Sequence, residues 1–244
     1  MHWDWQVFCN STLSGEVTAC FGAAGDITYL QWMISAWGWT VSVAALGFVT
    51  ALFFGVMVGI ARTLPLAPLA LVATVWTELF RNIPLLVQVF LWYHVLPVFI
   101  PAFSGVSSFW LAAIALGLFT SARIAEQVRA GLQSLPPGQA MAAKALGLSP
   151  AMVYAKVLLP QALRIILPAF TSEAMNVVKN SSVAFAVSVT ELTLFAMQAQ
   201  EETGRGLEIY AGVTLLYALT ALSVNRVMVW IESRTRLPGM VGAH

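Results

Sequence analysis

The stretch TVSVAALGFVTALFFGVMVGI, from Thr40 to Ile60, decides the class of fold. It carries no charged side chain, and it lies inside a longer stretch, from Ile27 to Ala61, that carries none either. A helix of about 20 apolar residues crosses the hydrocarbon core of a bilayer. The stretch therefore predicts a membrane-spanning helix.

The composition of the whole chain extends this prediction. Of 244 residues, 59% are hydrophobic and 9% are charged, whereas a soluble domain carries roughly 25% charged residues. Such a chain cannot cover its own surface with polar groups, so we expect an all-α membrane protein in contact with the lipid bilayer. The net charge of +1 provides no field that would attract a nucleic acid, and we expect no nucleic-acid partner.

Prolines and charges divide the apolar sequence into five predicted spans. Arg62, Pro65 and Pro68 separate the first span from the second, and a loop with Pro97 and Pro101 separates the second from the third. The spans are expected at about 40–60, 68–93, 109–130, 165–199 and 209–231.

Basic residues predict the orientation of these spans. The first 61 residues contain neither Lys nor Arg, whereas the connection after the third span carries Lys144, Lys156 and Arg164. The C-terminal tail carries Arg234 and Arg236. Because cytoplasmic segments collect Lys and Arg, we expect the N-terminus outside and the C-terminus inside, which requires an odd number of spans.

These spans imply a division of the chain into segments. We expect an outer N-terminal segment over residues 1–39 and a transmembrane domain over 40–238. The transmembrane domain would include a cytoplasmic loop at about 131–164, and residues 239–244 would form a cytoplasmic tail.

The outer segment holds both cysteines of the chain, Cys9 and Cys20. In an oxidising compartment they can close a small loop, but reach alone does not establish the geometry of a disulfide. A bridge and two free thiols therefore remain alternatives. The three histidines, His2, His94 and His244, are scattered along the chain, and we expect no metal site.

The cytoplasmic loop is unusually apolar for a segment that meets water. The sequence GQAMAAKALGLSPAMVYAKVLLPQALRIILP, from Gly138 to Pro168, holds only three charges. Its start predicts a short helix over 137–146 that ends at Gly147 and is redirected by Pro150. Exposed apolar surface of this extent typically marks a contact with another protein. The alternative is a helix lying among the lipid headgroups.

This loop resembles the "EAA loop" of the permease subunits of binding-protein-dependent ABC importers. The family pattern, E-A-A, then G, then I/L-L-P, corresponds here to Met141-Ala142-Ala143, Gly147 and 158–160. Met141 replaces the acidic residue found in many members, which puts a salt bridge of that residue in doubt. The docking role of the loop is not affected by this difference.

The resemblance continues in order from about Thr40 to Pro238. ELFRNIPLLVQVF (78–90), LFTSARIAEQVRAGLQSLPPGQ (118–139) and TSEAMNVVKNSSVA (171–184) match further elements of the amino-acid permeases. The resemblance implies a type I ABC importer permease in the bacterial inner membrane, with a cytoplasmic coupling helix.

The same resemblance implies partners. The coupling helix would dock on a dimer of ATPase subunits through Ala142, Ala143, Gly147 and Leu148. This chain has no G-x-x-x-x-G-K-[ST] motif, so we expect no enzyme activity, no catalytic residue and no cofactor in it, with ATP and Mg²⁺ held by the ATPase. A second permease, related rather than identical, and a periplasmic solute-binding protein would complete the importer.

Charged residues inside the predicted spans are candidates for the substrate pathway, because ionisable groups at bilayer depth are expensive. Arg81 lies three residues after Glu78, and Arg123 three before Glu126, so each pair shares a helix face. The alternative is that these pairs only neutralise themselves. Lys179 lies six residues from the acid of its own span, on another face, and needs a different partner.

The motifs are most similar to those of the glutamate/aspartate permeases, whose patterns are L-F-T-x-A-R-x-x-E-Q-V-R-A, T-S-E-x-M-N-x-V-K-N-S and a terminal R-L-P-G. They correspond here to 118–130, 171–181 and Arg236–Gly239. An arginine can offer an acidic side chain two parallel hydrogen bonds. We therefore expect an importer of acidic amino acids, and the alternative is an importer of other polar amino acids. The expected pathway residues are Arg81, Arg123, Asn176, Lys179, Asn180 and Ser181.

Two other classes of protein compete with this interpretation. A secondary, ion-coupled transporter is usually built of two repeats, and the sequence shows no convincing internal repeat. An intramembrane enzyme needs a nucleophile with a base, or metal ligands. His94 is the sole histidine of the membrane region, and its aromatic neighbours favour an interfacial position over a catalytic one.

Overall fold

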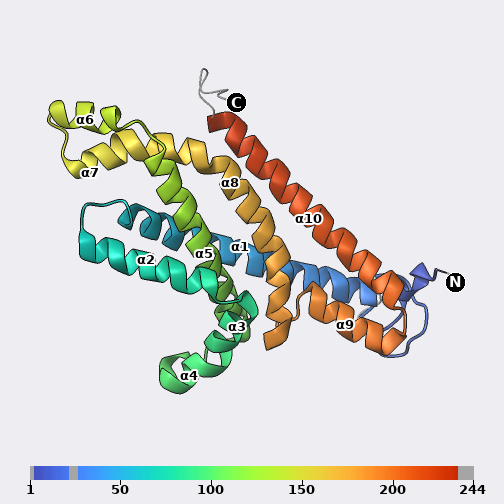
Figure 1. Ribbon diagram of the computed structural model, residues 1–244. Helices are drawn as coiled ribbons and strands as arrows, with labels where there is room; N and C mark the ends of the chain where they lie inside the picture. The colour runs from blue at the N-terminus through green and yellow to red at the C-terminus, as the bar shows by residue number, and fades with distance from the viewer. Residues whose placement is uncertain (1–2, 22–26, 236–244) are drawn as a thin grey trace. The chain divides into compact units, whose positions relative to one another are not determined.

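The computed structural model describes residues 3–21 and 27–235, and no β-strand is formed among them. Helices account for most of this part of the chain, as Figure 1 shows. The longer helices are α1 (Tyr29–Ala61), α2 (Ala67–Asn82), α5 (Ser108–Gln133), α6 (Pro137–Ala145), α8 (Leu159–Asn180), α9 (Leu192–Thr203) and α10 (Gly206–Thr235). The short elements are η1 (Trp5–Cys9), α3 (Leu85–Phe90), η2 (Leu91–Val95), α4 (Leu96–Phe99), η3 (Pro101–Phe103), α7 (Pro150–Val153), η4 (Tyr154–Leu158) and η5 (Ser181–Val187).

The helices fit an all-α membrane protein, as expected. Within the described residues, four helical runs are long and apolar enough to span a bilayer, or five if a broken pair is counted as one span. The four are α1, α5, the run Pro150–Val187 and α10, and the broken pair is Ala67–Asn82 with Leu85–Phe99. The end of the predicted transmembrane domain at 236–238, the Arg236–Gly239 motif and the tail at 239–244 lie outside the described residues.

The second predicted span, 68–93, was wrong as a continuous helix. Helix α2 ends at Asn82, and Ile83 is extended with φ −93° and ψ 130°. A residue that precedes a proline is disfavoured in the helical conformation. Pro84 therefore breaks the span, and α3 begins at Leu85.

The fourth predicted span, 165–199, was also wrong as a single helix. Helix α8 begins earlier, and after Asn180 the chain tightens into the 3₁₀ turns of η5. The hydroxyls of Ser181 and Ser182 donate to the carbonyls of Val178 and Lys179, at 2.7 and 2.8 Å. Such local bonds compete with helix continuation. Ser188 then adopts a left-handed conformation with φ 60°, and a separate helix α9 follows.

Two compact units are formed by these elements. The first draws on residues 1–46, 85–115 and 178–222, and the second on 47–84, 116–177 and 223–244.

In the first unit, the N-terminal segment packs on α1, α9 and α10. Val7 and Phe8 join a buried cluster with residues of these helices, including Met33, Phe195 and Ile209. The backbone N–H of Asp4 donates to Glu208 at 2.9 Å, which fixes the segment to the start of α10.

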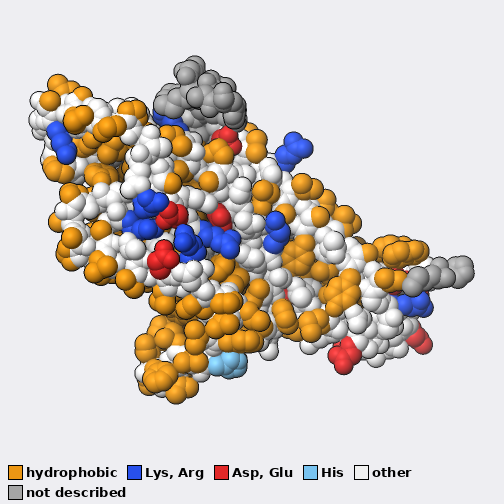
Figure 2. All heavy atoms as spheres, viewed as in Figure 1, with side chains coloured by type: hydrophobic (Ala, Val, Ile, Leu, Met, Phe, Trp, Pro, Cys, Tyr) orange, Lys and Arg blue, Asp and Glu red, His pale blue; other side chains and the backbone are white. Residues whose placement is uncertain are grey.

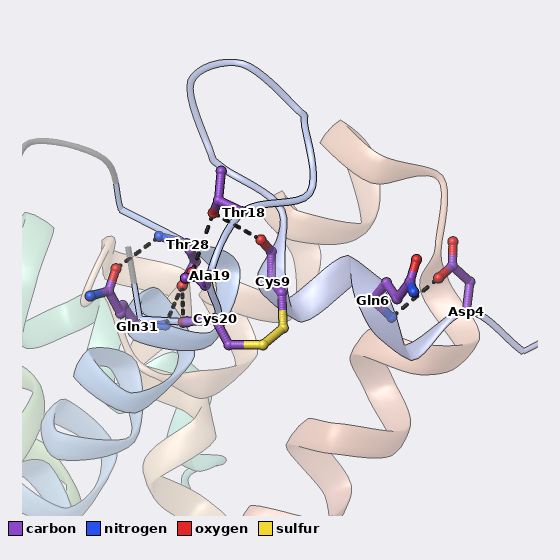
Figure 3. The surroundings of a disulfide bond; sticks show 8 residues. All are labelled: Asp4, Gln6, Cys9, Thr18, Ala19, Cys20, Thr28 and Gln31. Atoms are coloured by element: carbon purple, nitrogen blue, oxygen red, sulfur yellow. Dashed lines mark hydrogen bonds between the residues drawn. A yellow bond between two sulfur atoms is a disulfide. The ribbon is translucent and has the colours of Figure 1, made fainter. Parts of the chain in front are cut away.

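Local bonds hold the N-terminal segment to the start of α1. Cys9 and Cys20 form a disulfide (Figure 3), so the bridged alternative is the one observed. Thr28 and Gln31 cap α1 reciprocally: the Thr28 N–H donates to the Gln31 side chain at 3.0 Å, and the Gln31 N–H donates to the Thr28 hydroxyl at 3.4 Å. The Thr28 hydroxyl also donates to the Cys20 carbonyl at 2.8 Å.

In the second unit, α1 and α5 approach closely through glycine. A Cβ atom on Gly55 would lie 2.5 Å from the Ile124 side chain, and one on Gly59 would lie 2.6 Å from that of Val128. Ile124 and Val128 are almost completely buried, in a cluster with Ala51 and residues of α8. Small residues spaced by four let membrane helices pack backbone to backbone, and here they set the core of this unit.

This contact predicts the effect of filling the glycine positions. Replacing Gly59 with Ile should separate α1 from α5, because the added atoms meet Val128 and the Ala125 carbonyl inside van der Waals distance. Overpacking of this kind costs about 1–3 kcal/mol of stability. The measurement is the unfolding temperature of the purified protein in detergent. Gly38→Ala, also in α1 but with open space around its Cβ position, is the matched control and should not lower that temperature. Equal losses in both variants would contradict the close contact.

Candidate functional site

The second unit gathers charged side chains on α5 and its neighbours. Arg123 lies 3.8 Å from a carboxylate oxygen of Glu173, which α8 contributes and which is almost completely buried. The Gln127 amide donates to the other Glu173 oxygen at 3.2 Å. The Arg123 guanidinium stands over the Phe119 ring, 4.9 Å from its centre, and its side chain remains 40% exposed. Figure 2 shows acidic and basic side chains grouped where Figure 1 draws α5.

The expected pairing of Arg123 with Glu126 was wrong. Glu126 instead binds Arg62, at the end of α1, at 2.5 Å, and Arg129, one turn later on α5. Arg62 is only 12% exposed, so its charge requires a partner at close range. With Glu126 engaged twice, Arg123 keeps donors that its 3.8 Å contact with Glu173 does not use.

Arg81 and Glu78 form the ion pair that the sequence predicted. They are 3.6 Å apart near the end of α2, and each side chain is about half exposed. Asn82 adds a hydrogen bond to the Glu78 carboxylate at 2.9 Å. These local contacts suit a pair that neutralises itself.

The remaining predicted pathway residues lie on α8 and the start of η5. Lys179 is exposed, and no ion pair among residues 3–21 and 27–235 includes it. Asn176 and Asn180 are partly buried, and Ser181 is buried. An exposed ammonium in a membrane-spanning run can bind a carboxylate or a carbonyl oxygen.

The predicted docking helix is present as α6, and its end has a defined geometry. Gly147 has φ 82°, its N–H donates to the Lys144 carbonyl at 2.9 Å, and the Leu148 N–H donates to the Ala143 carbonyl at 3.1 Å. This is a Schellman motif with glycine in the left-handed position. A Cβ on Gly147 would meet nothing within 4 Å, so the backbone conformation, and not a close contact, requires glycine.

The surface of α6 divides into a buried and an exposed side. Ala143 is buried, whereas Met141 is 63% exposed and Leu146, next to Gly147, is 84% exposed. Ala142 is exposed as well, and Leu148, after the end of α6, is partly buried. Exposed apolar side chains on a helix whose opposite side is already packed can be covered by another protein.

Sequence analysis missed two groups of residues that hold the helices in place. Gly55 and Gly59 form a GxxxG pattern in an apolar run, a signal that would have identified the α1–α5 contact. Glu191 is fully buried before α9, where its carboxylate accepts from the Thr193 and Leu194 amides and from the Tyr217 hydroxyl at 2.6 Å. Burial raises the pKa of Glu191, against these hydrogen bonds, which lower it. The sequence signals for an N-cap are Ser, Thr, Asp and Asn, so Glu191 carried no clear signal of this role.

Comparisons with known proteins agree with this architecture. The sequence pattern of the family described as binding-protein-dependent transport system inner membrane component matches residues 47–237. The glutamate/aspartate import permease protein GltJ of Escherichia coli K12 is 37% identical, over 98% of each chain. The probable amino-acid ABC transporter permease protein PatM of Vibrio harveyi is 31% identical, over 81% of this chain and 88% of that one.

Solved structures support the same conclusion. A crystal structure of an amino acid ABC transporter with histidines matches with a TM-score of 0.75 and 31% identity, over 84% of this chain and 95% of that chain. An inward-facing structure of the MetNI methionine ABC transporter matches with a TM-score of 0.73 and 21% identity, which shows the shared fold. These relatives favour an ABC permease over a secondary transporter. The chain is a transport component that crosses the inner membrane several times, and it belongs to the family of inner membrane components of binding-protein-dependent transport systems.

Proposed function

We propose that this chain forms one half of the pore of an ATP-driven importer for glutamate and aspartate. The exposed guanidinium of Arg123 is the observation that carries this proposal. It combines a positive charge in a membrane span with donors that Glu173 does not use. The 37% identity to a glutamate/aspartate import permease over 98% of the chain supports the same substrate class.

The chemistry of the pathway follows from the charges around Arg123. A carboxylate that passes Arg123 can accept charge-assisted hydrogen bonds, which are stronger than those between neutral groups. Glu173 repels a negative substrate, so it limits how long the substrate stays. Binding that is favourable yet weak suits conduction through a pore. Arg81 (already paired with Glu78) and the polar groups of Asn176, Lys179, Asn180 and Ser181 would contribute further contacts along the pathway.

Partners would supply what this chain lacks. Two ATPase subunits would bind ATP and Mg²⁺ and dock on α6 and the following turn, at Ala142, Gly147 and Leu148. Ala143 is buried within this chain, so it would support the docking surface without contacting the partner. A second, related permease would complete the pore, and a periplasmic solute-binding protein would deliver the substrate. The family match supports this set of partners, since its description names a binding-protein-dependent system.

The proposed orientation places the N-terminus outside and α6 in the cytoplasm. The distribution of Lys and Arg supports it, because the first 61 residues have none. The disulfide between Cys9 and Cys20 agrees with an oxidising compartment at the N-terminus. In this arrangement, residues 40–238 form the pore domain and 131–164 the coupling loop.

Reporter fusions test this orientation. Fusions after Gly22, Gly138 and Gly242 should report outside, inside and inside. The measurement uses one reporter active only in the cytoplasm and one active only in the periplasm. An external Gly138 would contradict both the five-span topology and the docking role of α6.

Variants at Gly147 test the docking segment. Gly147→Val should uncouple ATP hydrolysis from uptake, because a β-branched residue is strained at φ 82° and the Schellman motif would open. Gly147→Asn is the matched control, since asparagine tolerates the left-handed conformation, and it should retain most coupling. The measurement is the number of substrate molecules transported per ATP in reconstituted vesicles. Normal coupling in Gly147→Val would exclude α6 as the transmission element.

A substitution at Arg123 tests the substrate. Arg123→Ala should lower glutamate and aspartate uptake by about tenfold or more, the effect of losing one hydrogen bond to a charged group. ATP hydrolysis should continue, because it would occur on the partner. The measurement is uptake of labelled substrate beside ATP hydrolysis.

Two further variants make this test specific. Arg123→Ala alone leaves the buried Glu173 carboxylate without its cation. The double variant Arg123→Ala/Glu173→Gln also removes this negative charge, so it separates a folding defect from a loss of transport. Arg234→Ala, at an exposed arginine near the end of α10, is the control and should transport normally. Normal glutamate and aspartate uptake by Arg123→Ala would show that Arg123 is only a structural partner of Glu173.

A further inference from the structure

A tyrosine links the segment that follows α6 to the end of α1. The hydroxyl of Tyr154 donates to the backbone carbonyl of Thr63 at 2.8 Å and lies 3.4 Å from the Thr63 hydroxyl. Thr63 lies just beyond the end of α1, where its own hydroxyl donates to the Ile60 carbonyl at 2.8 Å. Tyr154 and Thr63 are 91 positions apart in sequence, so this bond is a tertiary contact between two connections.

The position of Tyr154 is unusual for a helix. It begins η4, a π-helical turn that directly follows α7 and precedes α8. Turns of this kind occur rarely and are frequent at functional sites. Helix α6 packs against η4, and α7 continues directly into it. Any displacement of α6 and α7 therefore acts directly on the residue that holds Thr63.

From Thr63 the contacts continue into α5. The neighbouring residue Arg62 forms its 2.5 Å ion pair with Glu126, and Glu126 binds Arg129 on the same helix. The Tyr154 ring also packs against the buried cluster that contains Ile124 and Val128. The Tyr154 hydrogen bond, the peptide bond between Thr63 and Arg62, and the Arg62 ion pair thus connect η4 to α5 through the end of α1.

We propose that Tyr154 is a positioning residue that transmits movement of the α6–α7 segment to α1 through its hydrogen bond to Thr63. This inference rests on the proposed docking of an ATPase on α6. The hydroxyl is the essential group, because the ring alone would pack against the cluster without fixing the end of α1. A hydrogen bond at this position makes Thr63 move together with Tyr154. Packed elements shift between discrete arrangements, so such a contact can pass a displacement from one element to the next.

Tyr154→Phe removes only the hydroxyl and tests this role. In the complete importer, with its ATPase and binding protein, uptake per ATP hydrolysed should fall about fivefold, the effect of one hydrogen bond between neutral groups. ATP hydrolysis and the unfolding temperature should change little. Tyr93→Phe, in η2 of the first unit, is the matched control and should leave uptake per ATP unchanged.

The outcomes separate this inference from the proposed function. A purely structural role would lower the unfolding temperature and both activities together, with uptake per ATP unchanged, and would overturn the proposal. Normal coupling in Tyr154→Phe beside uncoupling in Gly147→Val would overturn the role of Tyr154 alone. Normal coupling in both variants would overturn the docking role of α6 as well. Uncoupling in both, with stability retained, is the expected result.

Discussion

The contact of α1 with α5 at Gly55 and Gly59 is the constraint on which the rest of the second unit depends. With no side chain at these positions, the backbones of the two helices come close enough for Ile124 and Val128 to be buried. Apolar side chains gain little from leaving lipid for protein, so close packing must supply the attraction between helices. The same approach brings Arg62, at the end of α1, within reach of Glu126 on α5.

Charge in this unit is arranged around that contact. Arg62 and Glu126 are each partly or mostly buried, and a lone charge in such surroundings would be costly. Arg129 adds a second cation to Glu126, which leaves Arg123 with Glu173 as its acidic partner. An arginine with free donors beside a buried carboxylate is suited to a brief contact with a negative group, rather than to permanent binding.

Features that neighbouring residues determine could be predicted from the sequence, whereas contacts between residues far apart in sequence could not. Long apolar runs predicted α5 and α10 correctly, because hydrogen bonding of the backbone polar groups within each helix is a local requirement. They also predicted α1, but this helix begins at Tyr29, inside the segment expected to lie outside the spans. Pro84 and the serines after Asn180 carried the signals for the two broken spans, but apolar composition concealed them. The partners of Arg123 and Glu126 could not be derived from the sequence. Their spacing on one helix favoured an ion pair between the two, whereas their observed partners depend on how the helices pack against one another. Among the site residues, the conformation of Gly147 followed from sequence, whereas the packing of Glu173 and Tyr154 required the assembled helices.

The way the N-terminal segment packs has a consequence for biogenesis. Asp4 and Glu208 are 204 positions apart, and Val7 and Phe8 share one cluster with Ile209 and Val213. The N-terminal segment therefore gains its full set of native neighbours only after α10 has been synthesised and inserted. Contacts of such long sequence separation form late. A chain interrupted before α10 would leave Val7 and Phe8 without the part of their cover that Ile209 and Val213 supply, and exposed apolar surface of this kind is what chaperones and proteases act on in incompletely folded proteins.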